Sequence, residues 1–569
     1  MKARSHRRTT GRGVLAGLLT AFLALGVAQL VAGISRPQGS PVAAVGSLAI
    51  DHTPPAVKNF AIATFGSHDK TALVTGILVV LAILAAGIGV AAMRRLSYGL
   101  LGLAGFAVIG LLAALTRPNA EAVDVLPTLI GVAAGAFTLA QLVRAAGRGT
   151  AAPALKGPGH DRPAATRGGA GADDWVPRSP GADAPGPGQP PAAPPRPAVT
   201  ARSGPPGPGG RGEDLQPPGR RAFLAAGTAA LAVGGISAVA GRSLAERSNV
   251  SAAIASVHFP RAAHPVPPLP PGANLGIKGL SPFVTPDGSF YRVDTALILP
   301  QVDPKNWQLR IHGMVEREIT IDFAQLLRRP LIEDWITLCC VSNPVAGPYI
   351  GNAKWLGASL ASLLRTARVR AGADQLLCTS TDGFTSGTPI ATVLDGRDAL
   401  LAVGMNGAPL PVAHGFPVRM VVPGLYGYVS ATKWVTDIKV TTYQAEVAYW
   451  AQRGWSQQAP IKTECRIDVP GGSVRAGRTP VAGVAWAQHK GIDAVHVRVD
   501  RGAWQQARLA AVPGIDTWRQ WVWDWDATSG THTIEARATD ATGYTQTAVQ
   551  AAPEPNGASG YPSITVSVS

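Results

Sequence analysis

Uninterrupted apolar residues occupy five segments of this chain. They are Val14–Ile34, Ala72–Met93, Tyr98–Thr116, Val125–Val143 and Ala222–Ala240. Each contains roughly 18–22 residues, the length of an α-helix that crosses the hydrocarbon core of a bilayer. A single segment of this kind is also compatible with a buried core helix, but nothing amphipathic surrounds the set. The pattern therefore predicts five membrane-spanning helices, four of them within residues 1–143 and the fifth at 222–241.

Basic residues in the short connections predict the orientation of these spans, because Lys and Arg concentrate in cytoplasmic loops. Several Lys and Arg residues precede the first span, Arg94 and Arg95 lie between the second and third, and 144–221 is rich in Arg. The connections Ser35–Thr71 and Arg117–Asp124 carry mixed charge. We therefore expect a multi-pass protein of the cell membrane in which everything after Gly241 is extracytoplasmic.

The segment 144–221 is dominated by Pro, Gly, Ala and Arg, as in PGADAPGPGQPPAAPPRP. Such a composition cannot bury enough apolar surface to offset ordering and predicts a disordered cytoplasmic linker. The segment leads into Gly219–Leu224, GRRAFL, which resembles the twin-arginine export signature with Gly where Ser or Thr is usual. Twin Arg before an apolar run is also an ordinary cytoplasmic flank, so both interpretations stay open.

Hydrophobic periodicity divides the C-terminal half into two parts. Within 259–456, FAQLLRR and SLASLLRTARV have helical spacing, whereas LRIHGMV and WVTDIKVTTY are typical of strands. After Gly471 the pattern alternates, with Val495, Val497 and Val499 on one face of a strand and Trp521, Trp523 and Trp525 on one face of another. We therefore predict an α+β domain at 259–456 and a β-sandwich at 457–569.

The net charge of the chain bears on whether it binds nucleic acid or membrane lipid. The 569 residues carry a formal net charge of +16, which raises the question of nucleic acid binding. No Lys/Arg run with interleaved aromatic residues is present, as such a surface would need. Much of the basic excess lies beside the apolar segments instead. This distribution favours contact with membrane lipid and no nucleic acid.

The chain has four cysteines, and two of them, Cys339 and Cys340, are adjacent in DWITLCCVSNPVAG. A bridge between neighbours is strained, because side chains alternate along a strand. A zinc site is poorly supported without C-x2-C spacing. Two buried residues, a nucleophilic cysteine with His414 and Asn343 as helpers, or one thiolate on a soft redox metal held by an organic dithiolene all remain open.

Several ordered motifs carry a resemblance to a known family. They are ITLCCVSN, GNAKWLG at Gly351–Gly357, STDGFTSGTPI at Ser380–Ile390 and HGFPVRMVVPGLYGYVSATKW at His414–Trp434. Together they strongly resemble the sulfite-oxidase-type molybdopterin-dependent oxidoreductases, here in a membrane-anchored form. TPDGSFYRVDTALILPQVD at Thr285–Asp303 resembles the family's entry segment. The sandwich is similar to its immunoglobulin-like molybdenum-cofactor dimerisation domain, so a homodimer is left open.

The resemblance implies a set of site residues. Cys340, in the family's Cys-x-x-Asn element, would supply the thiolate to molybdenum, while Cys339 would belong to the core. Contacts to the molybdopterin cofactor are implied for Tyr291, Arg292, Asp382, His414, Arg419, Ser430, Thr432 and Lys433. The spacing before Lys433 is one residue longer than the commonest pattern. Arg292 and Arg453 would hold an anionic substrate.

The resemblance also implies the chemistry. Family members pass an oxo group between molybdenum and a small anionic or sulfur-containing substrate. Phe384 stands where sulfite-oxidising members have a Tyr, which puts sulfite itself in doubt. No haem-attachment C-x-x-C-H is present, and the electron-transfer partner is unknown. The alternative is a membrane-anchored binding protein that kept the fold and lost the cofactor, although such a protein has no need to keep Cys340, His414 and Arg419 together.

Overall fold

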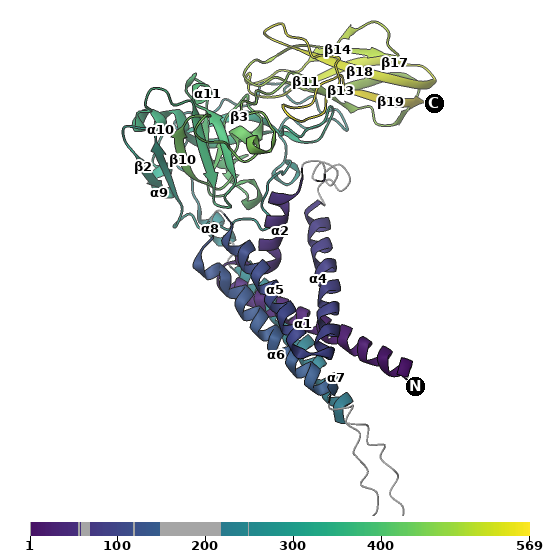
Figure 1. Cartoon of the computed structure of the whole chain (residues 1–569). Helices are drawn as coiled ribbons and strands as arrows, with labels where there is room; N and C mark the ends of the chain where they lie inside the picture. Colours follow the sequence, from purple (N-terminus) through teal and green to yellow (C-terminus); the bar gives the residue numbers. More distant parts are fainter. Residues whose placement is uncertain (1, 55–56, 58–68, 118–119, 148–217, 248–249) are drawn as a thin grey trace, which may run out of the picture.

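The computed structural model describes residues 2–54, 57, 69–117, 120–147, 218–247 and 250–569. A bundle of long helices carries two β-rich units at one end (Figure 1). Most of the predicted linker, 148–217, lies outside the described residues. The flanks of that linker prediction, 144–147 and 218–221, belong to helices.

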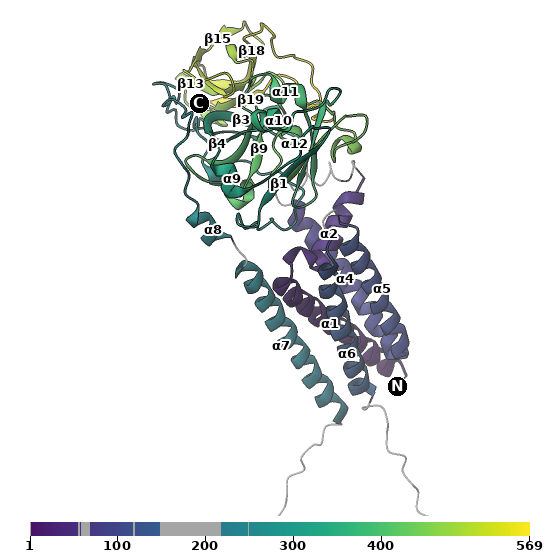
Figure 2. The ribbon, with the colours of Figure 1, turned by 90° about the vertical axis from the view of Figure 1, so that its left-hand side faces the viewer.

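Five helices of the described chain are long and apolar enough to cross a membrane, as predicted. They are α1 (Lys2–Ile34), α4 (Asp69–Arg94), α5 (Leu96–Leu115), α6 (Leu126–Gly147) and α7 (Pro218–Arg247). Helix α1 contacts α4, α6 and α7 and so forms the centre of the bundle (Figure 2). Large apolar side chains on the outer faces, such as Leu101 and Ile83, are exposed.

Small residues hold α1 against α7. A Cβ atom on Gly26 would lie 2.2 Å from the carbonyl oxygen of Gly234, and one on Gly33 would lie 2.3 Å from that of Gly241. The spacing of seven residues on both helices repeats the contact two turns later. Small residues let helix backbones approach closely. Such contacts are typical of helices inside a bilayer, where the hydrophobic effect does not drive association.

The connection between the first two spans contains a helix that the sequence analysis assigned to a loop. Helix α2 (Pro41–His52) begins with Pro at its first position, where the missing N–H costs nothing. It packs on α5 and α4. A Cβ on Gly46 would lie 2.6 Å from Leu297 Cδ1, so α2 also abuts the β-rich part of the chain.

Two sheets build the α+β domain. One has the order β2-β1-β10-β5-β6, in which β1 and β10 are parallel, and the other has the order β3-β4-β7-β8 with β9 on β7. The strands are β1 (Gln308–Gly313), β2 (Ile319–Asp322), β3 (Leu331–Cys339), β4 (Ile350–Ser359), β5 (Gln375–Ser380), β6 (Thr385–Pro389), β7 (Leu400–Met405), β8 (Ala408–Pro409), β9 (Arg419–Val421) and β10 (Val435–Thr441).

Short helices complete the α+β domain. FAQLLRR contains α9 (Phe323–Leu327), and SLASLLRTARV contains α10 (Leu360–Ala367), so both helical predictions are confirmed. Ser359 caps α10, since its Oγ accepts a hydrogen bond from the backbone N–H of Ser362. Helices α11 (Ile390–Leu394) and α12 (Gly427–Ser430) also belong to this domain, and α8 (Ser251–Ser256) precedes it.

The C-terminal part is a sandwich of two sheets, as predicted. Val495 and Val497 of one sheet and Trp521 and Trp525 of the other are buried in one core between them. The strands are β11 (Glu464–Val469), β12 (Ser473–Val474), β13 (Gly477–Trp486), β14 (Ile492–Val499), β15 (Gln505–Gln506), β16 (Arg508–Leu509), β17 (Arg519–Ala527), β18 (Gly530–Asp540) and β19 (Ser563–Val568). The immunoglobulin-like assignment and the dimer stay predictions.

The sandwich is docked directly onto strand β3. Thr337 Oγ1 accepts a hydrogen bond from the backbone N–H of Trp518 at 2.7 Å, and the Thr337 carbonyl accepts one from Gln488 Nε2 at 3.0 Å. Arg466 of β11 donates to the carbonyl of Gly347 at 2.9 Å. These contacts fix the end of β3 and the turn that follows it, which is where Cys340 lies.

Candidate functional site

A cavity of about 1000 Å³ opens between the α+β domain and the end of helix α2. Its walls come from five parts of the chain that are distant in sequence: α2, the segment after Ser289, the turn after β3, the loop after β5, and the stretch from His414 to Trp455. Residues 552–554 of the sandwich close one side. The cavity therefore collects residues from all three parts of the molecule.

Cys340 contributes a thiol to this cavity. It directly follows β3 and is buried, with Sγ 3.0 Å from Ser342 Oγ. Its backbone N–H donates to the Tyr349 carbonyl, and its carbonyl accepts from the N–H of Asn343, which closes a tight turn. Burial raises the pKa of this thiol, while Ser342 and Lys433 oppose the rise. The thiol faces the cavity in a fixed position.

The other cysteines lie elsewhere. Cys339 is fully buried in the main hydrophobic core, as predicted. Cys378 and Cys465 are also buried, and all four cysteines are free. Within the described residues, no group of three or more His, Cys, Asp or Glu side chains could hold a metal ion by itself. Cys340 is thus the one thiol that the cavity offers.

Arg419, at the start of β9, places a cation in the cavity wall without a carboxylate partner among the described residues. Only 5% of the residue is exposed. Its three nitrogens donate to the carbonyls of Met420, His414 and Ala431, and it lies 5.0 Å from the ring of Trp355. Burial lowers its pKa to about 10. A buried charge of this kind requires an anion for compensation.

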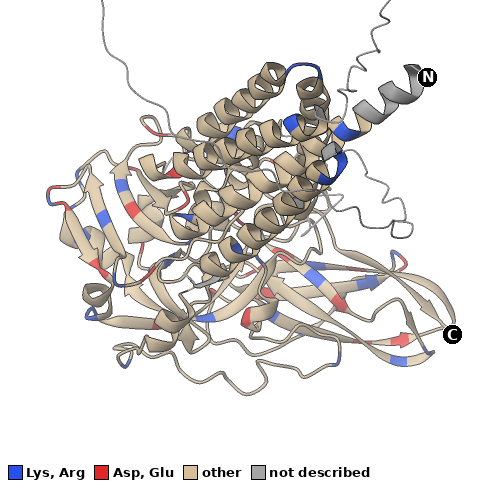
Figure 3. Ribbon diagram, turned by 90° about the horizontal axis from the view of Figure 1, so that it is seen from below, with Lys and Arg blue, Asp and Glu red and all other residues tan. Residues whose placement is uncertain are grey.

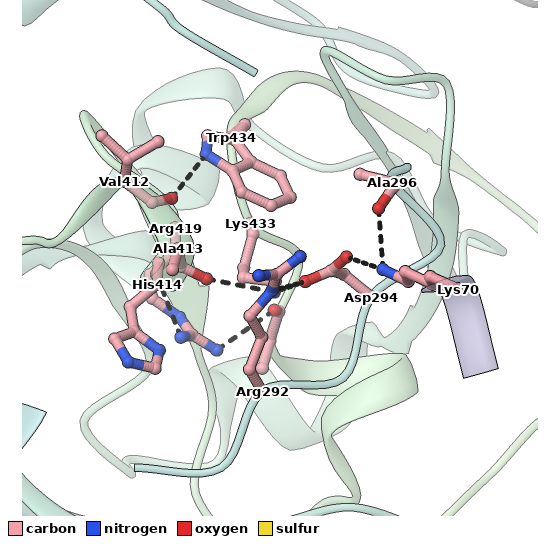
Figure 4. Close-up of polar contacts among 11 residues, drawn as sticks. Lys70, Arg292, Asp294, Ala296, Val412, Ala413, His414, Arg419, Lys433 and Trp434 are labelled. Carbon is pink, nitrogen blue, oxygen red and sulfur yellow. Dashed lines mark hydrogen bonds and ion pairs between the residues drawn. The ribbon is translucent and has the colours of Figure 1, made fainter. Parts of the chain in front are cut away.

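Lys433 belongs to an ion-pair network centred on Asp294 (Figure 4). Asp294 Oδ2 accepts from Lys433 Nζ at 2.8 Å and from Arg292 Nε at 2.8 Å, and Oδ1 accepts from Lys70 Nζ at 2.7 Å. Burial opposes ionisation of Asp294, but the three cations hold its pKa well below the ordinary value. Burial lowers the pKa of Lys433 to about 8 in spite of Asp294.

His414 is a neutral side chain at the inner end of the cavity. Burial, together with the positive charges of Arg419, Lys433 and Arg292, lowers its pKa to about 4. Its Nε2 lies 3.0 Å from the carbonyl oxygen of Asp287, so the neutral ring donates from Nε2 and keeps Nδ1 as an acceptor. The adjacent Gly415 has φ +108°, and a Cβ there would lie 3.1 Å from that of Lys433.

Tyr291 lines the cavity, but its neighbour Arg292 does not. The Tyr291 ring stacks on Phe290 with ring centroids 5.4 Å apart. Burial raises the Tyr291 pKa far above its ordinary value, so the hydroxyl is a donor. The Arg292 side chain is 40% exposed and bound to Asp294. The structure therefore does not bring Arg292 to the place expected for a substrate-holding residue.

Three other predicted contacts are placed differently from one another. Asp382 lines the cavity, and its Oδ1 accepts from the N–H of Phe384 at 3.2 Å. Ser430 Oγ donates to the carbonyls of Leu425 and Tyr426, and Thr432 Oγ1 lies 2.5 Å from Ser386 Oγ. Both hydroxyls are buried outside the cavity lining, whereas Ala431 and Lys433 line it. Trp434 lines it too, so within 430–434 the residues outside the lining are Ser430 and Thr432.

Arg453 reaches the outer part of the cavity, but helix α2 engages it. Its guanidinium lies 3.5 Å from the ring centroid of Tyr449 and 3.6 Å from Asp51 Oδ1. Tyr449 Oη donates to the same Asp51 oxygen at 2.7 Å. Trp450 and Trp455 pack beside it with centroids 6.1 Å apart. The predicted substrate-holding arginine is therefore already paired.

Sequence reasoning missed Asp294, Lys70 and Asp51. Asp294 lies two residues beyond Arg292, and this spacing in an extended segment is a signal for a shared face. No local signal identifies Lys70 or Asp51, because both belong to the helical bundle and reach the site only through tertiary packing.

The residues present fit a molybdenum–molybdopterin cofactor. Cys340 would supply one thiolate ligand, and Arg419 and Lys433 would supply cations for a phosphate. Asn343 is buried, and its Nδ2 has no hydrogen-bond partner among the described residues. Gly427 lines the cavity without a side chain. A single thiol beside Arg419, a buried cation without a carboxylate partner among the described residues, suits a metal whose other ligands come from an anionic organic group.

Comparisons with known proteins agree with this fit. Residues 296–450 match the sequence model of the oxidoreductase molybdopterin binding domain. Sulfite oxidase from Gallus gallus is 31% identical over 43% of this chain and 63% of that protein. Nitrate reductase [NADH] 1 from Oryza sativa subsp. japonica is 31% identical over 33% of this chain and 23% of that protein.

The chain thus spans less than two thirds of the length of either curated relative. Among solved structures, the sulfane dehydrogenase SoxCD from Paracoccus pantotrophus aligns with a TM-score of 0.42 and 23% identity. That alignment covers 48% of this chain and 75% of that one.

Proposed function

Because this chain carries a molybdopterin-dependent oxidoreductase domain of the sulfite-oxidase type, we propose that it is a membrane-anchored enzyme whose catalytic domain faces away from the cytoplasm. The reaction is an oxo transfer to or from a small substrate. When bound, the molybdenum cofactor supplies the two-electron chemistry, and the protein supplies position and charge.

This proposal rests mainly on one observation: Cys340 and Arg419 line the same cavity. The thiol is the only one that the cavity contains, and the guanidinium has carbonyl partners alone among the described residues. A binding protein that had lost its cofactor would gain nothing from a buried cation without a counter-ion, which destabilises a fold. The arrangement therefore favours the enzyme over the binding protein.

The residues of the chain divide the remaining work. Arg419 and Lys433 would hold the cofactor's phosphate, and neutral His414 would offer its Nδ1 to the cofactor as a hydrogen-bond acceptor. Asp294 keeps Lys433 charged and positioned. Tyr291 would donate from its hydroxyl, and the rings of Phe384 and Trp450 add apolar surface to the cavity wall.

Charge along the helix ends supports the proposed orientation. Arg94, Arg95, Arg144, Arg220 and Arg221 lie at or next to the ends of α4, α5, α6 and α7 that are remote from the β-rich units, and Arg12 lies in the first part of α1. Figure 3 views the molecule from this side and shows Lys and Arg at these helix ends. At the opposite ends, Arg36 is paired with Glu121 and Asp124. A basic surplus on one side only is typical of the cytoplasmic face.

Metal analysis tests the proposal. Full-length protein matured in a host that makes the cofactor should contain close to one molybdenum per chain and should release a pterin on denaturation. Cys340→Ser should abolish turnover and alter the metal's X-ray absorption by removing a sulfur ligand. Arg419→Met should lose most of the pterin, because its phosphate is left without a cation.

Cys465→Ser is the matched control. Cys465 is also a buried cysteine, and its thiol donates to Gln546 Oε1 at 3.2 Å, a bond that a serine hydroxyl can replace. This variant should keep both metal and turnover. Folded wild-type protein that contains neither molybdenum nor pterin would overturn the proposal in favour of a binding protein.

A further inference from the structure

The outer part of the catalytic cavity is partly built by the helical bundle. Asp51, His52, Thr53 and Pro54 at the end of α2 line it together with Arg453 and residues 552–554. Helix α2 is held there through Gly46, which packs on Leu297, and through the hydrogen bond from Tyr449 to Asp51. A membrane-side helix thus faces the route by which a substrate reaches Cys340.

Charged groups divide this cavity into two parts. Arg419 and Lys433 line the inner part, where a cofactor phosphate would lie under the proposed function. In the outer part lie three carboxylates, Asp51, Asp382 and Glu554, and one guanidinium, Arg453. His52 is beside them, with its Nδ1 3.0 Å from the Leu48 carbonyl.

A second arginine acts on the outer part from outside it. Arg117 lines an adjoining cavity of about 90 Å³ that shares Asp51 and Asp382 with the main one. Asp382 and Arg117 attract each other. Asp51 forms an ion pair with the Arg453 guanidinium, with Oδ1 3.6 Å from Nη2. It thus places a negative charge at the point where an anionic substrate would otherwise meet Arg453.

We propose that Asp51 is a specificity-determining residue of the catalytic cavity, which neutralises Arg453 and excludes dianionic substrates in favour of uncharged ones. The inference rests on the proposed function. Arg453 would otherwise be the natural clamp for an oxyanion. Here Tyr449 and Asp51 hold its guanidinium, and Phe384 adds an apolar wall without a hydrogen-bond donor. An uncharged molecule with a polar X=O bond suits these surroundings.

Calorimetric titration of the full-length holoenzyme in detergent tests the assignment, with sulfate as the dianion and dimethyl sulfoxide as the uncharged probe. The wild type should bind dimethyl sulfoxide in preference to sulfate. Asp51→Asn should bind sulfate roughly tenfold more tightly, as removal of one charge near a dianion predicts, with little change for dimethyl sulfoxide. The gain should shrink as salt is added.

Three variants separate charge from structure. Asp51→Glu keeps the charge and should retain the wild-type preference. Tyr449→Phe removes the hydrogen bond to Asp51 but not its charge, and should change sulfate binding little. Asp524→Asn removes an equivalent charge from an exposed pair with Arg478 on the sandwich and should leave both affinities unchanged.

Equal sulfate affinity of the wild type and Asp51→Asn would overturn the role of Asp51. The same increase in sulfate affinity in Asp524→Asn would also overturn it, because the effect would then not depend on the cavity. Neither result would bear on the cofactor, because molybdenum content is measured on the same samples. Conversely, protein that lacks molybdenum would refute the proposed function whatever the titrations give.

Discussion

At the scale of single residues, burial decides which ionisable groups respond to pH. Glu464 at the start of β11 is 4% exposed, and its Oε1 has no hydrogen-bond partner among the described residues. Burial raises its pKa to about 8, and the nearby positive charge of Lys462 only partly opposes this. The folded protein therefore holds a proton that an ordinary glutamate would release near pH 4.5.

We expect Glu464→Gln to remove a pH dependence of stability. The folded-state pKa is raised above the unfolded value, so this group's contribution is complete below pH 4.5 and is lost as pH rises to about 8. Between these values, the free energy of unfolding of the wild type should fall relative to the variant by up to about 1.4 kcal/mol per pH unit. Denaturant titrations across this pH range measure the difference.

Glu318→Gln provides the comparison, because Glu318 is exposed and its pKa is lowered by Arg310. Unlike Glu464→Gln, Glu318→Gln should not become more stable than the wild type as the pH rises toward 8. Identical slopes for the wild type and Glu464→Gln would mean that water or a rearranged side chain already satisfies the buried carboxylate.

Individual site residues were predictable to different degrees. Cys340, His414 and Arg419 could be found because several motifs occur in one order, and the structure brings all three to the same cavity. The orientations of Arg292 and Ser430 could not be predicted, since the direction of a side chain depends on the phase of the backbone.

Asp51 could not be found at all. Its role depends on contact with Arg453, which lies far along the chain, and periodicity carries no information about such contacts.

At the scale of elements, length explains what was predicted and what was missed. The five apolar helices exceed the length of a span and could be located from composition alone. Helix α2 has 12 residues, too few to cross a bilayer, and its Pro and Gly residues are typical of a loop. It is stabilised by packing on α5 and on the α+β domain, which no local pattern encodes.

Close contact between α1 and α7 makes a prediction about Gly26. A Cβ there would lie 2.2 Å from a backbone oxygen, so Gly26→Ala must push the helices apart. We expect a loss of roughly 1–3 kcal/mol in stability, although alanine itself favours a helix. Thermal unfolding of the detergent-solubilised protein measures the effect as a lower midpoint.

Gly235→Ala is a close control, because nothing lies within 4 Å of a Cβ at that position of α7. It should leave the midpoint unchanged or raise it slightly. If both substitutions behaved alike, helix propensity rather than interhelical packing would govern the bundle.

At the scale of the whole molecule, the helical bundle and the α+β domain build the catalytic cavity together. Lys70 at the beginning of α4 binds Asp294, Asp294 binds Lys433, and α2 supplies a cavity wall. Both contacts come from the helix ends nearest the β-rich units (Figure 1). With the bundle anchored in a membrane as proposed, a substrate would enter this cavity beside the membrane surface, on the side that the orientation of the bundle decides.

Thiol labelling tests that orientation, because all four native cysteines are free and buried. Ser529→Cys adds an exposed thiol in the turn between β17 and β18, and Ser97→Cys adds one near the turn between α4 and α5, beside Arg94 and Arg95. In intact cells, a membrane-impermeant maleimide should label the first variant and not the second. In permeabilised cells both variants should be labelled. This result would show that the Ser97→Cys thiol is accessible and is protected in intact cells only by the membrane.

The opposite pattern in intact cells would put the cavity in the cytoplasm. In that case the arginines at the far helix ends would face outward, against the charge rule that relates basic loops to the cytoplasmic side. The catalytic assignment would survive, since it depends on Cys340 and Arg419 alone, but the substrate and the electron partner would then have to be cytoplasmic molecules.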